Sequence, residues 1–257
     1  MRLPLLAIAA LLLSWTAQAQ PLAAHKAMYE LQMHSARSDV IAASGKMAYE
    51  VTDACDAWAV RQRLEMTITN RDGQDTDMIS DYTTWESKDG SRLRYRLRQT
   101  TDDAVTSEIS GEATLSAPGG TGTARYTLPE ATEKKLPAGT LFPMAHTEAL
   151  LKAAAAGKKF IALPLFDGTS ATGAQDSSVA IASWLPPGPS QWKGLETLPS
   201  GRVHIAFFDN DNANQQPDYE VGMRYWSNGV ADEMLMDFGD FVMRGTLKTF
   251  NLLPSGC

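Results

Sequence analysis

The sequence predicts an all-β protein built on antiparallel strands, with one notable helix. Three observations lead to this fold class. Apolar and polar residues alternate with a period of two over many stretches, which is typical of half-buried strands. Turn signals such as Arg71-Asp72-Gly73 and Lys88-Asp89-Gly90 recur about every 8–15 residues, the spacing of an antiparallel meander. Only one helical pattern of any length interrupts the strands.

The first half of the chain is expected to consist of strands joined by short polar turns. Strand patterns run over His25–Met33, Val40–Val51, Ala59–Asn70, Thr76–Glu86, Arg92–Thr101, Glu108–Ser116 and Thr123–Leu128. Cys55 falls in the polar connection between the second and third of these strands. The alternation indicates that one face of each strand is buried.

One helix is expected over Met144–Ala156, where alanines and Leu150-Leu151 are strong helix formers. Pro143 suits its first turn and Gly157 suits the position just past its end. Further strand patterns follow over Lys158–Phe166, Val179–Ser183, Arg202–Asp209, Tyr219–Trp226, Val230–Phe238 and Phe241–Leu252. No stretch resembles a linker, so residues 20–257 are expected to form a single domain.

The first 19 residues are predicted to be a secretory signal peptide. Arg2 precedes an apolar run from Leu3 to Leu13, and Ala17-Gln18-Ala19 is a small-x-small cleavage site. The run is too short to span a bilayer, and no second long apolar run follows. We therefore expect an exported protein without a transmembrane segment. We also expect a monomer.

The charge balance argues against nucleic acid as a partner. The chain carries 23 basic and 30 acidic residues, a formal net charge of −7 at pH 7. An acidic chain is poorly suited to bind nucleic acid or an anionic membrane surface.

Cys55 and Cys257 are the two cysteines of the sequence, and Cys257 is its last residue. Exported proteins fold under oxidising conditions, where an even cysteine count predicts pairing. A bond between them would close nearly the whole mature chain into one loop; two free thiols are the alternative.

The histidines offer little support for catalysis or for a metal site. No two of His25, His34, His146 and His204 have a metal-ligand spacing. His146 lies in the first turn of the expected helix, where it either joins the helix to the sheet by a buried hydrogen bond or acts as a catalytic base. No Gly-x-Ser-x-Gly elbow and no Gly-rich phosphate loop occurs, so neither a cofactor nor a metal is expected.

Two polar patterns have both a binding and a structural interpretation. Asp209, Asp211 and Glu220 match positions one, three and twelve of a calcium loop, but Ala213 fails at position five, which favours a polar hairpin loop. Four alternating arginines form either an anion-binding face or a solvated outer face paired with acidic neighbours, namely Arg92, Arg94, Arg96 and Arg98.

Aromatic residues suggest an apolar groove on the inner face of the sheet. The expected groove residues are Trp58, Tyr82, Trp85, Tyr225 and Trp226. The sequence also holds 11 methionines, whose adaptable side chains suit a surface that accepts varied apolar chains. The alternative is that these residues fill a packed core against the helix.

Several motifs follow one another in a specific order along the chain, namely Ser44–Glu50, Cys55–Trp58 followed by Arg61–Arg63, Leu136–Pro143 with His146, Leu165–Gly168, and Cys257. In this order they resemble the EipB family of periplasmic cell-envelope integrity proteins from α-proteobacteria, formerly a domain of unknown function. The resemblance implies that the protein is located in the periplasm. The resemblance implies a single long antiparallel sheet curled into an open barrel or β-spiral, with one α-helix packed against it. It also implies a disulfide between Cys55 and Cys257.

The resemblance implies an envelope maintenance factor that is not an enzyme and acts by binding an envelope component or a protein partner. Its fold is similar in outline to periplasmic lipoprotein carriers, so a carrier of lipid or lipoprotein acyl chains is an alternative. A hydrolase of envelope polymers that uses His146 or Asp167 is the alternative from another class.

Overall fold

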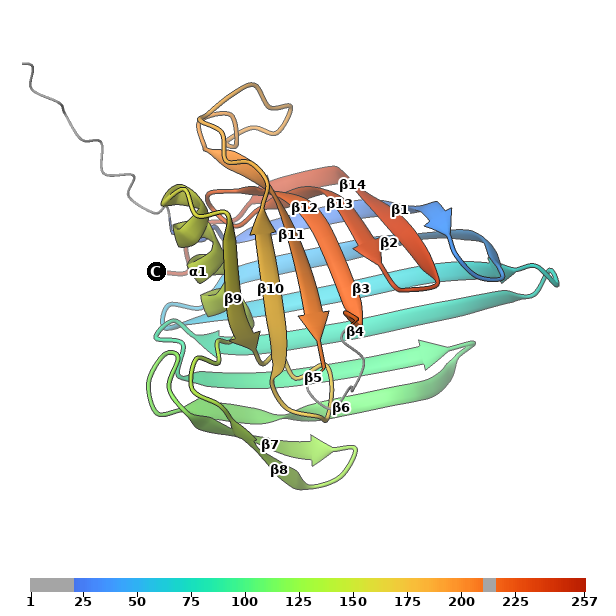
Figure 1. Cartoon of the computed structure of the whole chain (residues 1–257), viewed down its shortest axis with the longest axis horizontal. Helices are drawn as coiled ribbons and strands as arrows, with labels where there is room; N and C mark the ends of the chain where they lie inside the picture. The colour runs from blue at the N-terminus through green and yellow to red at the C-terminus, as the bar shows by residue number, and fades with distance from the viewer. Residues whose placement is uncertain (1–20, 210–215) are drawn as a thin grey trace, which may run out of the picture.

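The computed structural model describes residues 21–209 and 216–257, so the expected signal peptide lies outside the described residues. Fourteen strands form one antiparallel sheet in the order β8-β7-β6-β5-β4-β3-β2-β1-β14-β13-β12-β11-β10-β9. Each ladder in the sheet therefore joins two strands that are consecutive in the chain, except the ladder between β1 and β14 (Figure 1). The expected antiparallel all-β fold is confirmed.

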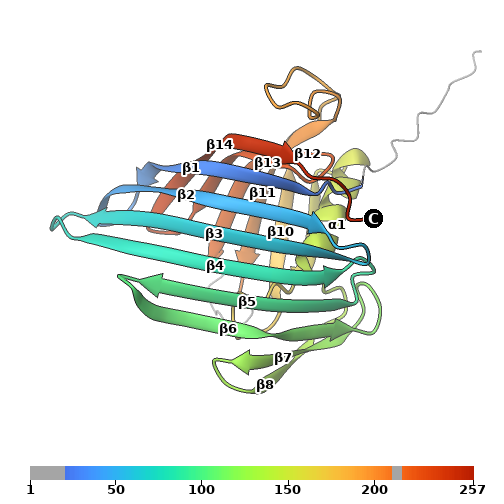
Figure 2. The ribbon, with the colours of Figure 1, turned by 180° about the vertical axis from the view of Figure 1, so that it is seen from behind.

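The first eight strands make the longer wall of the molecule, in which β1 to β6 run side by side (Figure 2). Their bounds are β1 His25–Ala36, β2 Val40–Asp53, β3 Ala57–Asn70, β4 Asp75–Ser87, β5 Arg92–Thr101, β6 Ala104–Leu115, β7 Gly122–Leu128 and β8 Thr132–Leu136. Strand β5 illustrates why these stretches form strands with one buried face. Its residues Leu93, Tyr95 and Leu97 are buried, while the arginines between them are exposed. Strand β8 was not expected from the sequence, because its residues are polar and exposed except Leu136.

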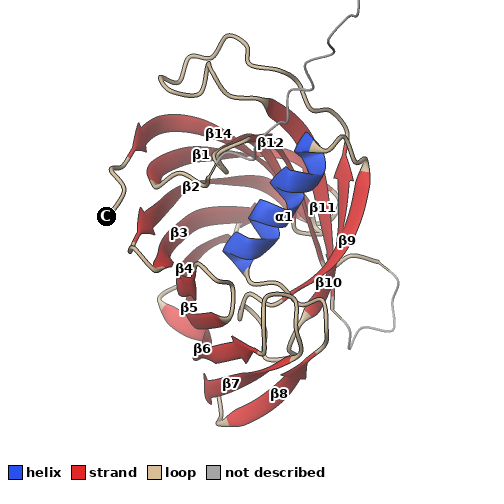
Figure 3. Ribbon diagram, turned by 90° about the vertical axis from the view of Figure 1, so that its left-hand side faces the viewer, coloured by secondary structure: helices blue, strands red, loops and turns tan. Residues whose placement is uncertain are grey.

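The remaining strands form the second wall, which faces the first across the interior (Figures 1 and 3). Their bounds are β9 Phe160–Leu165, β10 Gln175–Ile181, β11 Ser200–Phe208, β12 Tyr219–Trp226, β13 Ala231–Asp237 and β14 Phe241–Leu252. The bounds of β12 and β14 are those expected from the sequence, and the bounds of the other strands differ from expectation by a few residues. The largest difference is in β10, which begins earlier than expected.

Helix α1, Pro143–Ala155, lies across one end of the curled sheet (Figure 3). Pro143 occupies its first turn, and Gly157 follows its end with φ +74°. Both positions match the preferences expected for helix termini. The helix buries Leu150, Leu151 and other apolar residues against the strands, and so closes this end with a packed core.

The interior is filled by two apolar clusters. The larger cluster packs α1 against inward side chains of both walls, including Leu31, Val179 and Met243. The smaller cluster lies between β5 to β8 and the segment after β9, around Tyr95 and Phe166. A third cluster lies outside, where Leu195 covers Trp226.

The sheet does not close into a complete barrel. No ladder joins β8 to β9, the two edge strands. Instead the segment before α1 touches β9 at a single parallel bridge, Leu141 to Leu165. There the N–H of Leu141 donates to the carbonyl of Pro164 at 2.9 Å, and the N–H of Phe166 donates to the carbonyl of Leu141 at 3.0 Å. The expected open barrel is thus confirmed.

Cys55 and Cys257 form a disulfide with a Cα–Cα distance of 5.5 Å across a sequence separation of 202. Cys55 lies between β2 and β3, and the carboxyl-terminal tail runs from the end of β14 to reach it. The predicted pairing is therefore present, and it ties the last strand of the chain to the turn between β2 and β3.

Candidate functional site

The end of the barrel that holds α1 contains the polar groups that are buried most deeply. Glu86, on the inward face of β4, is 1% exposed. Its carboxylate accepts hydrogen bonds from the backbone N–H of Met144 at 2.8 Å and of Ala145 at 2.9 Å. Burial raises the pKa of Glu86 to about 7, although these two N–H donors act in the opposite direction. The sheet thus caps the first turn of the helix.

His146 is the second buried polar group of α1, and it is bonded to β10. Its Nε2 lies 2.7 Å from Ser177 Oγ, and the Ser177 hydroxyl donates to the carbonyl oxygen of Leu163 at 2.6 Å. Because the single hydroxyl proton is directed at Leu163, the histidine Nε2–H is the donor to Ser177. Burial lowers the pKa of His146 to about 4, which keeps the ring neutral. The expected hydrogen bond between helix and sheet is present.

This arrangement differs from an activated serine. A nucleophilic serine gives its proton to the histidine, whereas Ser177 receives one from it and donates to a backbone carbonyl. Both side chains are also less than 5% exposed, so a substrate has no access to them. The geometry therefore assigns the pair a structural role in holding α1.

Asp167, the other candidate of the hydrolase hypothesis, organises the loop after β9. Its carboxylate accepts from the N–H of Thr169 at 2.9 Å and from Gln175 Nε2 at 3.2 Å. Its backbone carbonyl accepts from the hydroxyl of Tyr82 at 2.5 Å. These bonds hold the loop against β4, and burial raises the pKa of Asp167.

The five residues expected to line an inner groove do not share one surface. Trp58 and Tyr225 lie inside and pack on the larger cluster, and Tyr82 packs on the smaller one. Trp85 lies on the outer face, where Arg94 from β5 stacks over its ring at 5.2 Å. Trp226 also faces outward, beneath Leu195. The prediction was wrong for these two because side chains alternate along a strand, so Trp226 cannot share a face with Tyr225.

The described residues show little empty space beside α1. A cavity of about 20 Å³ there is lined by Leu22, His25, Tyr49, Met144 and Tyr225 among others. That volume suits one water molecule and not an apolar ligand. At this end the inner face is a packed core, as the alternative interpretation of the aromatic residues held.

The opposite end of the inner surface is covered less completely. We call it the open mouth and define it by six half-buried apolar residues that pack on the larger cluster: Met33, Ile68, Met78, Phe207, Tyr219 and Phe238. The first three come from β1, β3 and β4, and the others from the second wall. Sequence analysis did not single out these residues, because only the curvature of the sheet brings the two groups to the same end.

The four alternating arginines lie on the outer face of β5, as expected. Arg96 forms an ion pair with Glu108 at 2.8 Å, and Arg98 lies opposite both Asp81 and Glu108 in the sheet register. The acidic neighbours expected for a solvated face are therefore present. An anion-binding role for this face stays a prediction.

Metal binding finds no support in the described residues. Within them, no three His, Cys, Asp or Glu side chains converge to hold a metal ion. Asp211 and Ala213 of the possible calcium loop lie outside the described residues, while Glu220 is bonded to His204 at 2.6 Å. None of the helices in the described part of the chain is long and apolar enough to cross a membrane.

Comparisons with known proteins agree on one family. The family model described as EipB-like matches residues 16–254. The cell envelope integrity protein EipB of Brucella abortus (strain 2308) is 29% identical over 254 residues, which cover 93% of this chain and 88% of that protein. A crystal structure of a beta-barrel-like protein of a domain of unknown function from Brucella abortus superposes with a TM-score of 0.83 and 26% identity, over 91% of this chain and 99% of that one. This chain belongs to the EipB-like family.

Proposed function

We propose that this protein maintains the integrity of the cell envelope by binding a component of the periplasm, and that it does so without catalysis. The open mouth carries the proposal. Its apolar side chains are half-buried at the one end of the inner surface that α1 does not cover, and partly uncovered apolar surface of this kind is typical of interaction sites. The proposed site belongs to a single domain that begins near Gln20, after removal of the signal peptide.

The family relationship supports the cellular role. The relative from Brucella abortus is named a cell envelope integrity protein. Export to the periplasm agrees with the predicted signal peptide and with the disulfide, since disulfides persist in oxidising compartments. The hydrogen bonding of His146 and Ser177 supports a role in binding over one in hydrolysis.

The proposal is tested by complementation of a deletion strain that is sensitive to detergent or to antibiotics against the cell wall. Met78→Asp, which puts a charge on the open mouth, should fail to restore resistance although the protein is exported and folded. Ser177→Ala should restore it, because the hydroxyl is structural. If Ser177→Ala folds normally and fails while Met78→Asp succeeds, a catalytic function is the better explanation.

A carrier of acyl chains is the second candidate. It is favoured by Met33 and Met78 on the open mouth, because methionine adapts to irregular apolar ligands. Titration with a long-chain fatty acid or a lipopeptide should then give saturable binding that Met78→Asp abolishes. The absence of binding by either amphiphile would reject the carrier and leave a protein partner.

A further inference from the structure

We propose that the open mouth binds a basic, amphipathic polypeptide segment of a partner protein, with its apolar side chains on the mouth and its lysines or arginines on the surrounding turns. The inference deepens the proposed function, since it names the chemistry of what binds at the same site. It depends on three features of the described residues: the charge of the turns around the mouth, an aromatic row along one side of it, and the contrast with the end that holds α1.

The turns at the mouth are strongly acidic. We call them the acidic rim and define it by the β1–β2, β3–β4, β5–β6 and β13–β14 turns with their adjoining strand ends. Six of its exposed aspartates are Asp39, Asp72, Asp75, Asp102, Asp103 and Asp240. Asp77 and Asp237 add two more carboxylates, and the basic residues of these described turns are Arg37 and Arg71. Eight acids against two bases account for most of the net charge of −7.

The two arginines neutralise only part of the acidic rim. Arg37 forms an ion pair with Asp237 at 2.7 Å. Arg71 lies 3.8 Å from Asp39, and both side chains are more than 70% exposed, so this pair contributes little. The remaining carboxylates lie on exposed turns and strand ends at this end of the molecule, where Asp75 and Asp77 accept hydrogen bonds from the hydroxyls of Thr69 and Thr67. Together they create a field that attracts cations and repels anions.

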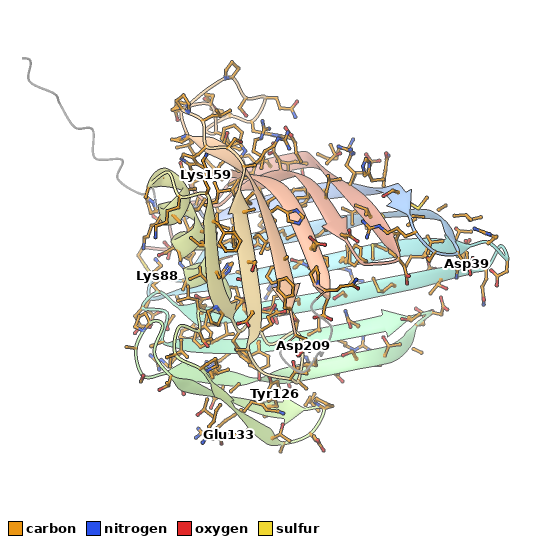
Figure 4. All side chains as sticks on the ribbon, viewed as in Figure 1. Asp39, Lys88, Tyr126, Glu133, Lys159 and Asp209 are labelled. Carbon is orange, nitrogen blue, oxygen red and sulfur yellow. A yellow bond between two sulfur atoms is a disulfide. The ribbon has the colours of Figure 1, made fainter. Side chains whose placement is uncertain are left out.

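The opposite end of the molecule does not carry this charge. Lys88 and Lys159 lie beside α1, whereas Asp39 lies at the far end of the longer wall (Figure 4). Lys88 is paired with Asp53 at 2.6 Å, and Lys152 of the helix with Glu148 at 3.4 Å. The negative charge is therefore concentrated at the mouth, and is not a property of the surface as a whole.

An aromatic row along the second wall adds a further preference for cations. The ring centroids of Phe207 and Tyr219 lie 6.0 Å apart, those of Tyr219 and Phe238 5.4 Å, and those of Phe238 and Phe241 5.3 Å. Phe207, Tyr219 and Phe238 are each half-buried, so the row is not fully covered. Aromatic faces attract lysine and arginine side chains through cation–π interactions and also accept apolar groups.

These features together select a polypeptide as the occupant. A phospholipid or lipid anchor with an anionic headgroup would have to place its charge against the acidic rim. A segment with alternating apolar and basic side chains matches both parts of the site, because its two faces meet the apolar mouth and the carboxylates at once.

The test is fluorescence anisotropy with a short labelled peptide that alternates leucine and lysine, added to the full mature protein. The matched probe has glutamate in place of lysine. We expect saturable binding of the lysine peptide that weakens as salt is added, and no binding of the glutamate peptide. Equal binding of the two probes, or no binding of the lysine probe, would overturn the proposal.

Two triple variants with the same change in net charge locate the site. Asp39→Asn/Asp103→Asn/Asp240→Asn removes three negative charges from the acidic rim, and we expect it to weaken binding about three- to tenfold. Asp56→Asn/Glu112→Gln/Glu148→Gln removes three charges elsewhere and should leave binding within twofold. An equal loss in both would show that only net charge matters and would contradict the proposal.

Phe238→Ala tests the apolar part, with thermal unfolding as the check that the variant is folded. We expect at least a tenfold loss of peptide binding. If this variant does not fold, the triple variants still decide the outcome. Saturable binding of a fatty acid by a protein that does not bind the peptide would assign the site to acyl chains and reject a basic segment.

The complementation assay separates this inference from the proposed function. If the rim triple variant loses peptide binding but still restores resistance, the mouth binds basic segments that envelope integrity does not require. If peptide binding fails while Met78→Asp still abolishes complementation, the proposed function stands and only the identity of the occupant is wrong.

Discussion

Glu86 and Met144 are 58 residues apart in the chain, yet the Glu86 carboxylate lies 2.8 Å from the backbone nitrogen of Met144. The first N–H groups of a helix have no partner within the helix, and Phe142 at the N-cap provides no side-chain hydrogen bond. Glu86 from β4 satisfies two of these groups and, when it is ionised, places a negative charge at the positive end of the helix dipole. The position of α1 therefore depends on a group from the sheet.

Glu86→Gln should change how the free energy of unfolding depends on pH. Burial raises the pKa of Glu86 from 4.5 to about 7, so between these values the folded state binds a proton that the unfolded state has lost. This stabilising contribution is complete below about pH 4.5 and is lost as pH rises to about 7. The wild type should therefore lose up to about 3 kcal/mol relative to Glu86→Gln from pH 4.5 to 8. Urea unfolding across this range is the measurement, and a constant difference would contradict the raised pKa.

His146→Gln should show a pH dependence of opposite sign. Burial lowers the pKa of His146 from 6.5 to about 4, so the unfolded state binds the extra proton between these values. The contribution of the neutral ring is present above about pH 6.5 and is lost as pH falls to about 4. The wild type should lose up to about 3 kcal/mol relative to the variant over that range. His204→Gln, at a more exposed ring bonded to Glu220, is the matched control.

The strands could be predicted from the sequence because most of them bury one face and end in a recognisable turn. Strand β5 shows both signals, in its alternation of arginine with Leu93, Tyr95 and Leu97 and in the Lys88-Asp89-Gly90 turn before it. Strand β8 shows neither signal, since it lies at an edge with exposed polar residues. Period-two alternation thus identifies a strand only where the fold buries one of its faces.

The candidate site could not be predicted in the same way. The role of Glu86 depends on a helix that begins 57 residues later, and no local pattern reports that approach. The open mouth likewise combines Met78 with Phe238, which only the curvature of the sheet relates. The prediction placed Trp226 on the inner face, but its indole lies on the outer face of the sheet, where Leu195 covers it.

Trp226→Ala and Trp85→Ala should differ strongly in stability. Trp226 is 2% exposed and packs with Leu195 and Val230, so its truncation leaves a cavity and should cost about 3–5 kcal/mol. Trp85 lies partly exposed on the outer face, where Arg94 makes a cation–π interaction with its ring, so its truncation should cost about 1–2 kcal/mol. Chemical denaturation of both variants is the measurement. Equal costs would contradict the assignment of the two residues to different environments.

Cys257→Ser should destabilise the protein without changing its fold. The disulfide closes a loop with a sequence separation of 202, which corresponds to at most about 5 kcal/mol in the chain-entropy model. The wild type under reducing conditions should unfold at the same urea concentration as the variant. A variant as stable as the oxidised wild type would show that the bond does not constrain the unfolded chain.

Gly168→Ala should be far more destabilising than Gly157→Ala, although both glycines have nearly the same positive φ angle. Their φ angles are +73° and +74°, so alanine at either position meets a similar backbone strain of about 1–2 kcal/mol. At Gly157 an added Cβ finds no atom within 4 Å, whereas at Gly168 it would overlap the ring of Tyr95 in the smaller cluster. The ring cannot withdraw freely because it also packs edge-to-face on Phe166, with centroids 5.4 Å apart. The difference in unfolding free energy between the two variants therefore reports mainly on this contact, and we expect it to exceed about 2 kcal/mol. Gly168→Ala in a Tyr95→Leu background should recover much of the loss, and no recovery there would show that the glycine is needed for its backbone and not for the close approach of Tyr95.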